Sequence, residues 1–175
     1  MSLTMKSYAA GLFALLASST TVFAADATAT LSGLDGANHG SVTLAKSPSG
    51  QIMLMIELKD IPEGAHGFHI HETGSCDPGT DFKSAGGHLA GDHDHGTMAE
   101  NGPHPGDFPN IHVPASGTLT LEYFTDRISL DASTAGLFDA DGSSFIIHDG
   151  ADDYSSQPSG NAGSRIACGV ITKVN

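Results

Sequence analysis

Apolar and polar residues alternate along most of this chain, and this two-residue period limits the fold more than any other sequence feature. Side chains on a strand point alternately to opposite faces, so each alternating run offers one apolar face to a core. Because 22 of the 175 residues are glycine and 8 are proline, there is little room for long helices. The sequence therefore predicts an all-β fold, an antiparallel β-sandwich or a flattened β-barrel. The expected strands cover residues 28–34, 41–45, 51–59, 66–71, 116–124, 143–148 and 165–174.

Turn residues separate these runs, and two long segments interrupt them. The sequence Ser47-Pro48-Ser49-Gly50 predicts a hairpin between the second and third runs. Residues 72–115 and 149–164 show almost no alternation, and loops this long in a compact domain are either functional or disordered. Composition alone favours disorder. A flexible linker, however, does not need the histidines of the first segment, which are His88, His93, His95, His104 and His112.

The N-terminal segment, residues 1–24, has the order of a secretory signal. Lys6 precedes an apolar run that begins at Ala9 and ends near Leu16, and small residues lead to Ala24. The run is too short for a membrane-spanning helix, so we expect cleavage after Ala24, with an uncleaved amphipathic start as the alternative. Cleavage removes only Lys6 among the charged residues, so the net charge moves from −13 to −14. Because the chain is strongly acidic, we expect it to bind neither nucleic acid nor anionic membranes.

Export also changes how the two cysteines, Cys76 and Cys168, are interpreted. In an oxidising compartment two thiols favour one disulfide, with two free buried thiols as the alternative. Closing a loop of about 93 residues would restrict the unfolded chain by roughly 4 to 5 kcal/mol in the loop-entropy model.

The histidines carry the chemistry of this sequence. His69 and His71 in GFHIHETGSC lie on one face of the expected strand, while Ile70 points to the other face. Such a pair can bind a metal, although a solvated pair is the alternative. Eight of the ten histidines fall between residues 66 and 112. Imidazole suits copper and zinc, and a carboxylate can complete a zinc shell, so His104 and Asp107 in HPGD could turn toward one ion.

Five segments together resemble one family. GFHIHETGSC, SAGGH, GPHPGD, FIIHDGADDY and GNAGSRIACGVI occur in the order found in copper/zinc superoxide dismutases. The similarity covers most of residues 25–175, and the placement of Cys76 directly after HIH looks like the bacterial exported branch. The expected fold is thus a Greek-key, immunoglobulin-like barrel or sandwich of about eight strands with two long functional loops. The resemblance also implies a periplasmic location.

The resemblance implies two metal sites that share one residue. Copper is expected at four histidines, His69, His71, His88 and His148. Zinc is expected at His88, His95, His104 and Asp107, so that the imidazole of His88 bridges the two ions. One copper and one zinc are expected in each subunit of a monomer or homodimer.

Other residues match supporting positions of the family. Asp152 matches the carboxylate that ties a copper-side histidine to a zinc-side histidine. Arg165 matches the cation at the channel mouth, and Cys76 with Cys168 matches the family's disulfide. His66 matches a structural histidine outside the site.

The implied activity is dismutation of superoxide to dioxygen and hydrogen peroxide, an antioxidant defence outside the cytoplasm. Copper would cycle between Cu(II) and Cu(I), zinc would be structural, and His88 and Arg165 would be the catalytic side chains. An exported copper or zinc carrier with the same fold is the main alternative, and a copper-only dismutase is a second one. The complete set of expected ligands favours the enzyme.

Two departures from the family pattern concern the loops. LAGDHD between His88 and His95 replaces the usual sequence, so His93 offers a rival zinc ligand. We prefer His95 because it forms the family's His-Gly pair and stands nine residues before His104. The sequence SQPS lacks the lysine and glutamates that guide substrate in many eukaryotic members, which leaves Lys83 as the expected second helper beside Arg165.

Overall fold

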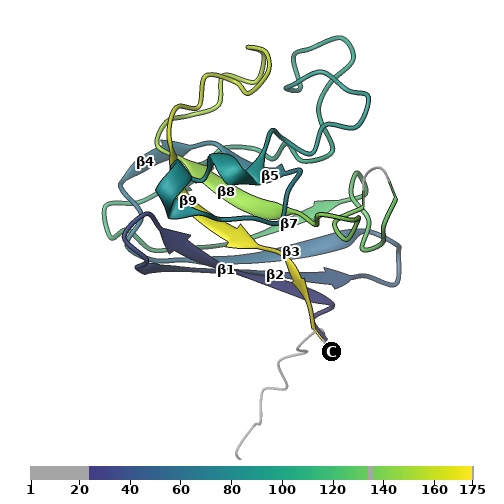
Figure 1. Ribbon diagram of the computed structural model, residues 1–175, viewed down its shortest axis with the longest axis horizontal. Coiled ribbons are helices and arrows are strands. Elements are labelled where there is room, and N and C mark those ends of the chain that lie inside the picture. The colour runs from purple at the N-terminus through teal and green to yellow at the C-terminus, as the bar shows by residue number, and fades with distance from the viewer. Residues whose placement is uncertain (1–23, 134–135, 175) are drawn as a thin grey trace, which may run out of the picture.

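The computed structural model describes residues 24–133 and 136–174 (Figure 1). The described residues form ten strands and two one-turn 3₁₀ helices, η1 (Pro78–Thr80) and η2 (Lys83–Ala85). The strands are β1 (Ala27–Gly33), β2 (Asn38–Lys46), β3 (Ile52–Leu58), β4 (Gly64–His66), β5 (Phe68–His71), β6 (Ile111–Val113), β7 (Leu119–Thr125), β8 (Ser144–His148), β9 (Arg165–Val170) and β10 (Thr172–Lys173).

The main sheet has the strand order β5-β8-β9-β1-β2-β3-β7, with β10 beside β1, and every pair of these strands is antiparallel. The chain passes from β3, near one edge, to β5 at the other edge, returns to β7 and then goes back to β8. These crossings between edges are the long connections of a Greek key. The sheet curls so that its two ends lie in separate layers (Figure 1). The all-β prediction is confirmed.

The core lies between the two layers because the strands alternate as the sequence predicts. Buried positions alternate along β1 and β3, and their inward side chains pack with those of β5 and β8 in one cluster. Phe68 and Phe145 stack at its centre with ring centroids 5.2 Å apart. Each fully buried large apolar side chain contributes about 1.5–3 kcal/mol, so this cluster holds the layers together.

Strand β8 is buried at all five residues, because a loop covers its outer face. Phe82 and Ala85 of the segment after β5 pack there against Ile146 and Cys168. The disulfide Cys76–Cys168, with 5.7 Å between the Cα atoms, joins this segment to β9. The disulfide prediction is thus confirmed. The disulfide therefore attaches the first long loop to the sheet on the N-terminal side of His88.

The predicted hairpin after β2 is also present. Lys46 lies opposite Ile52, and Gly50 adopts a φ of 92°, a left-handed conformation that favours glycine. The run predicted at 66–71 divides into β4 and β5 at Gly67, and the run at 165–174 divides into β9 and β10.

The prediction that residues 72–115 contain no strand is wrong at one place. Ile111–Val113 forms β6, which pairs with β4 in a separate two-stranded sheet. Residues 149–164 form no strand, as predicted. Part of the first loop, in teal, and the second loop, in yellow-green, extend to the top of Figure 1. Met98 N–H joins the two loops by donating a 3.1 Å hydrogen bond to the Tyr154 carbonyl.

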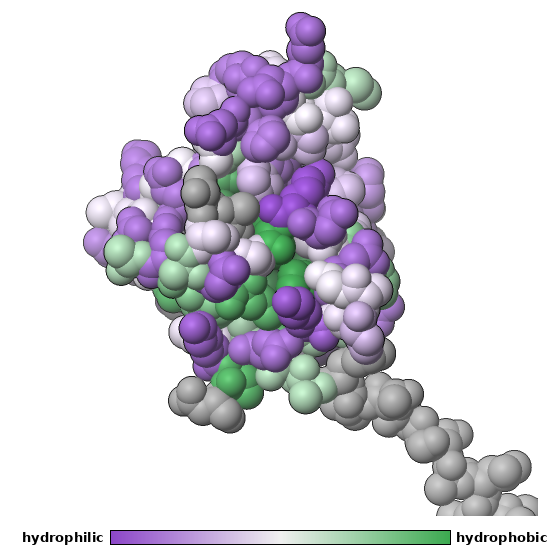
Figure 2. Space-filling model, turned by 90° about the vertical axis from the view of Figure 1, so that its right-hand side faces the viewer, coloured by the Kyte–Doolittle hydropathy of each residue, from purple (hydrophilic) through white to green (hydrophobic). Residues whose placement is uncertain are grey.

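One face of the molecule carries mainly hydrophilic side chains around a small apolar patch (Figure 2). No helix in residues 24–133 and 136–174 is long and apolar enough to span a membrane. The secretory signal predicted for residues 1–24 lies, apart from Ala24, outside the described residues.

Candidate metal centre

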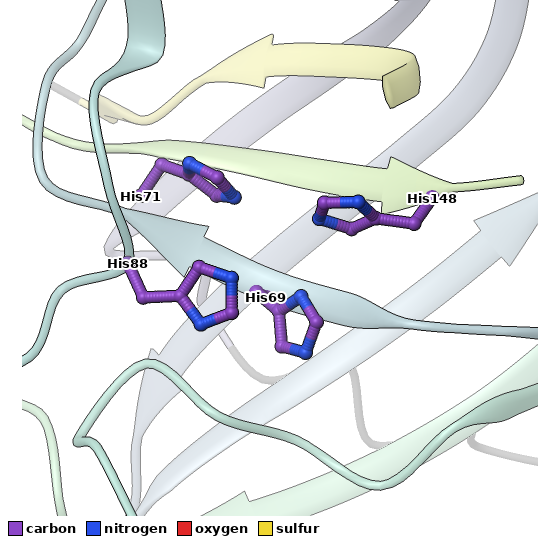
Figure 3. Close-up of side chains that lie close together, drawn as sticks. All are labelled: His69, His71, His88 and His148. Carbon is purple, nitrogen blue, oxygen red and sulfur yellow. The ribbon is translucent and has the colours of Figure 1, made fainter. Parts of the chain in front are cut away.

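Four buried histidines gather between β5, β8 and the first long loop. His69 and His71 come from β5, His148 ends β8, and His88 lies on the loop opposite His71. Their rings turn toward a common space (Figure 3). One nitrogen of each ring lies within 4.8 Å of those of the others. We call His69, His71, His88 and His148 the four-histidine group.

A second buried group shares His88 and comes entirely from residues 88–107. Its other members are His95, His104 and Asp107, and its ligand atoms also lie within 4.8 Å of one another. The two ends of this segment are bonded to β5: Leu89 N–H donates to the Ile70 carbonyl, and Ile70 N–H donates to the Gly106 carbonyl. We call His88, His95, His104 and Asp107 the His/Asp group.

The four-histidine group has the free nitrogens that a metal needs. His71 Nδ1 donates to the Gly86 carbonyl at 3.0 Å, and His148 Nδ1 donates to the Gly163 carbonyl at 3.2 Å. The opposite nitrogen is therefore the one with the free lone pair in each ring. Within residues 24–133 and 136–174, no hydrogen-bond partner meets the four nitrogens that face inward, which are His69 Nδ1, His71 Nε2, His88 Nε2 and His148 Nε2. Leaving a buried polar atom unsatisfied costs about 1–3 kcal/mol of folding free energy. A metal that takes imidazole ligands would satisfy all four nitrogens, so the group fits such a metal.

Burial keeps three of these imidazoles, those of His71, His88 and His148, neutral. It lowers the pKa of His88 to about 4, although a hydrogen bond to Asp107 opposes the shift. It lowers the pKa of His148 to about 3, with His69 adding to the effect, and it also lowers the pKa of His71. Because only neutral imidazole has a lone pair for a metal, these three residues are ready to bind one at neutral pH.

The His/Asp group is organised by Asp107. Its Oδ1 lies 2.9 Å from His88 Nδ1, and its Oδ2 accepts hydrogen bonds from the N–H groups of Gly96 and His104 at 2.9 and 3.1 Å. Burial on its own would raise the pKa of this carboxyl, but the adjacent His104 and His88 side chains outweigh burial and hold the pKa well below its usual range. His95 Nδ1 and His104 Nδ1 lie 3.2 and 3.3 Å from the carboxylate oxygens, and among the described residues neither atom has a partner in hydrogen-bond geometry. Three imidazoles and a carboxylate are donors that fit tetrahedral zinc.

Asp152 connects the two groups. Its Oδ2 accepts from His69 Nε2 at 2.7 Å, and its Oδ1 accepts from His95 Nε2 at 3.0 Å. The carboxylate thereby fixes the ring of one histidine in each group and leaves Nδ1 of both rings free. His69, His95 and Asp152 are also close enough together to hold an ion, but both Nε2 atoms already donate to the carboxylate.

Arg165 lies beside the four-histidine group. It begins β9 opposite His148, and its guanidinium donates to the carbonyls of Phe82 and Gly86 at 2.6 and 2.7 Å. The Gly86 carbonyl also accepts from His71 Nδ1, so one backbone oxygen orients both side chains. Burial lowers the pKa of Arg165 from its high ordinary value.

Three other residues considered from the sequence lie outside both groups. His93 is exposed, and its Nδ1 lies 3.2 Å from the Asn101 carbonyl. Lys83 is exposed and pairs with Asp81 at 3.5 Å. His66 is buried with its ring nitrogens 2.8 and 2.9 Å from two backbone carbonyls, those of His148 and Pro62.

Sequence reasoning missed Asn110. Its amide donates to the Asp152 carbonyl at 2.9 Å and accepts from Asp152 N–H at 2.8 Å, which joins the two long loops beneath the carboxylate. An asparagine 42 positions from its partner leaves no signal in a single sequence.

Comparisons with known proteins agree with this geometry. A family model described as copper/zinc superoxide dismutase (SODC) matches residues 38–171. A Cu-Zn superoxide dismutase from Caulobacter vibrioides is 43% identical over 150 residues, which is 83% of this chain and 84% of that protein. One from Aquifex aeolicus is 42% identical over 78% of this chain and 81% of that protein. The crystal structure of a superoxide-dismutase-like protein from Bacillus subtilis matches with a TM-score of 0.77 and 37% identity, over 82% of this chain and 96% of that one. The chain therefore belongs to the copper/zinc superoxide dismutase family.

Proposed function

We propose that this protein dismutates superoxide with one copper and one zinc ion per chain. Two superoxide ions and two protons give one dioxygen and one hydrogen peroxide, so one superoxide is oxidised and the other reduced. The observation that carries the proposal is the presence of two complete buried ligand groups that share His88, with Arg165 beside one of them.

We assign copper to the four-histidine group and zinc to the His/Asp group. Copper supplies the one-electron redox change, which zinc cannot provide. The carboxylate of Asp107 supports the assignment of zinc, because three nitrogens and one oxygen suit its tetrahedral preference. His88 directs Nε2 into the first group and Nδ1 toward Asp107 in the second, which is the arrangement that a bridging imidazole requires.

The proposed proton carrier is His88. Its Nε2 faces the four-histidine group and has no hydrogen-bond partner among the described residues, so whenever this nitrogen is not bound to a metal it could hold a proton where the reduced substrate needs one. Asp107 and the loop ends bonded to β5 keep the ring in place while the proton moves.

Arg165 is proposed to bind the anion. Two backbone carbonyls hold its guanidinium, and a guanidinium has five N–H donors, so donors remain for a small oxyanion. Because the side chain is only partly buried, an anion from solvent can reach it.

The test is to measure metal content and superoxide removal on the same purified sample. We expect one copper and one zinc per chain, loss of superoxide removal when a chelator takes the copper, and recovery when copper is returned. Bound copper without superoxide removal would instead support the metal-carrier function.

We further propose that residues 1–24 are a secretory signal and that residues 25–175 form the mature periplasmic domain, as a monomer or homodimer. The disulfide Cys76–Cys168 supports an oxidising compartment. N-terminal sequencing of protein recovered from a periplasmic fraction should begin at Ala25, and recovery of the full chain from the cytoplasm would contradict the proposal. Sedimentation equilibrium distinguishes the two oligomeric states.

A further inference from the structure

Gln157, in the second long loop, makes an unusual pair of contacts with a residue 62 positions away. Its Oε1 accepts a hydrogen bond from His95 N–H at 2.9 Å, and its Nε2 donates to the His95 carbonyl at 2.9 Å. One carboxamide thus satisfies both backbone groups of a single residue, as a neighbouring strand would do. The same Nε2 also donates to the Ser155 carbonyl at 3.2 Å, which holds the carboxamide in position.

The backbones of the two long loops pack closely beside these contacts. Gly96 has a φ of 86°, and a Cβ there would lie 2.1 Å from the Tyr154 carbonyl oxygen. Only glycine allows the two backbones to approach this closely. Met98 N–H bonds to that same carbonyl, so residues 95–98 are joined to residues 154–157 on both sides of the glycine.

Gln157 holds the backbone of His95, and a second contact orients its ring. Its Nε2 donates to Asp152 Oδ1 at 3.0 Å, and its Nδ1 has no partner and faces the His/Asp group. Both of these anchors, Gln157 and Asp152, belong to the second loop. His95 itself is fully buried.

His93, two residues earlier in the same HDH sequence, has none of these anchors. It is exposed, its N–H bonds to the nearby Ala90 carbonyl at 3.2 Å, and its ring faces the Asn101 carbonyl. The two histidines are chemically equal, so the difference between them comes from what holds each backbone.

We infer that Gln157 is a positioning residue that makes His95, rather than His93, the ligand of the His/Asp group. Gln157 belongs to neither ligand group and reaches the site through the backbone of His95. This inference rests on the proposed metal site.

The test replaces Gln157 with methionine, which has a similar length and lacks both hydrogen bonds. Gln51→Met is the matched control, because Gln51 is also exposed and lies in the hairpin after β2. Zinc retention is measured by titration with a chelator. The visible spectrum of Co²⁺ bound in place of zinc reports the ligand geometry. We expect Gln157→Met to release zinc about tenfold more easily and to change the cobalt spectrum, as loss of a residue that orients a ligand does. Gln51→Met should change neither.

A double variant distinguishes positioning of His95 from a general stabilisation of the loop. If Gln157 acts through His95, then Gln157→Met combined with His95→Ala should retain zinc as poorly as His95→Ala alone. The inference would be overturned if the double variant retained zinc less well than His95→Ala alone. It would also be overturned if Gln157→Met had the same zinc retention and cobalt spectrum as Gln51→Met. If His95→Ala itself has no effect on zinc, the proposed site is wrong, which is a different result from failure of the inference.

Should Gln157→Met fail to fold, Gln157→Glu provides the same test. Glutamate keeps the acceptor for His95 N–H and loses the donor to the His95 carbonyl. We expect a loss of zinc retention in this variant that also disappears on the His95→Ala background, and wild-type retention would overturn the inference.

Discussion

The two ligand groups share His88 but are built in different ways. In the four-histidine group, three of the four residues lie on β5 and β8, where the strand ladder sets their positions. In the His/Asp group, every residue lies on the loop of residues 88–107, which contains no strand. Backbone hydrogen bonds to β5 hold only the two ends of this loop. Between the ends, the loop relies on hydrogen bonds that the side-chain oxygens of Asp107, Asp152 and Gln157 accept.

This difference indicates how much each group depends on its surroundings. A ladder position survives most substitutions of neighbouring side chains, because backbone hydrogen bonds hold it. A loop position is lost when the polar side chain that holds it is removed. We therefore expect distant substitutions to disturb the His/Asp group more than the four-histidine group.

The largest effect is expected where the two groups meet. His88→Ala should retain some copper through His69, His71 and His148 but lose at least about 100-fold of its superoxide removal, because the proposed proton carrier is gone. Copper content and activity are measured on the same sample. A variant with bound copper and activity within a factor of two of wild type would show that His88 does not bridge the groups.

The next prediction contrasts two histidines of the loop. His95→Ala should weaken zinc retention by at least about tenfold, whereas His93→Ala should leave it unchanged, since His93 is exposed and outside the group. A zinc chelator is titrated into both variants. The opposite ranking would assign the ligand role to His93, and equal losses would mean that either residue can serve.

A smaller effect concerns the charge beside the four-histidine group. The mature chain's expected charge of −14 repels superoxide, but screening acts over about 8 Å at physiological ionic strength, so nearby cations dominate. Arg165→Glu should reduce the dismutation rate by about tenfold and reverse its salt dependence. Lys83→Glu should change the rate less, because Lys83 is exposed and paired with Asp81. Pulse radiolysis across a salt series gives these rates, and equal slowing by salt in wild type and Arg165→Glu would exclude steering by Arg165.

The smallest effect is the pH dependence of the stability of the metal-free protein. The pKa values of His88 and His148, about 4 and about 3, lie below the value of 6.5 expected for unfolded histidine. The unfolded chain therefore binds more protons, and stability should fall as the pH drops from 6.5 toward 3. The depressed pKa of Asp107 adds a further loss only below its unfolded value of 3.8. Melting temperatures of the metal-free protein and of His148→Gln test this prediction, since the variant should lose less stability between pH 6.5 and 4.

The strands and the HIH pair could be predicted from local pattern. The two-residue period places His69 and His71 on one face of β5 because alternation is a property of the strand itself. The period also located every strand of the main sheet, and the turn residues Ser47-Pro48-Ser49-Gly50 located the hairpin. It missed β6, since its three residues lie in a segment without alternation and are defined only by pairing with β4.

The loop ligands could not be derived in that way. His95 was preferred to His93 only through the family's His-Gly pair and its nine-residue step to His104, because HDH offers two equal side chains. The physical difference between them lies in Gln157 and Asp152, which are 62 and 57 positions away from His95. Contacts of this range depend on the folded positions of two loops, and a single sequence does not record them.

The shared residue His88 is proposed to join two groups that hold different metals. Diffraction from a crystal of the metal-loaded protein, collected on both sides of the copper and zinc absorption edges, tests it directly. Copper should appear among His69, His71, His88 and His148, and zinc among His88, His95, His104 and Asp107. Zinc bound through His93, the same metal at both positions, or an ion that does not contact His88 would contradict the proposed bridge.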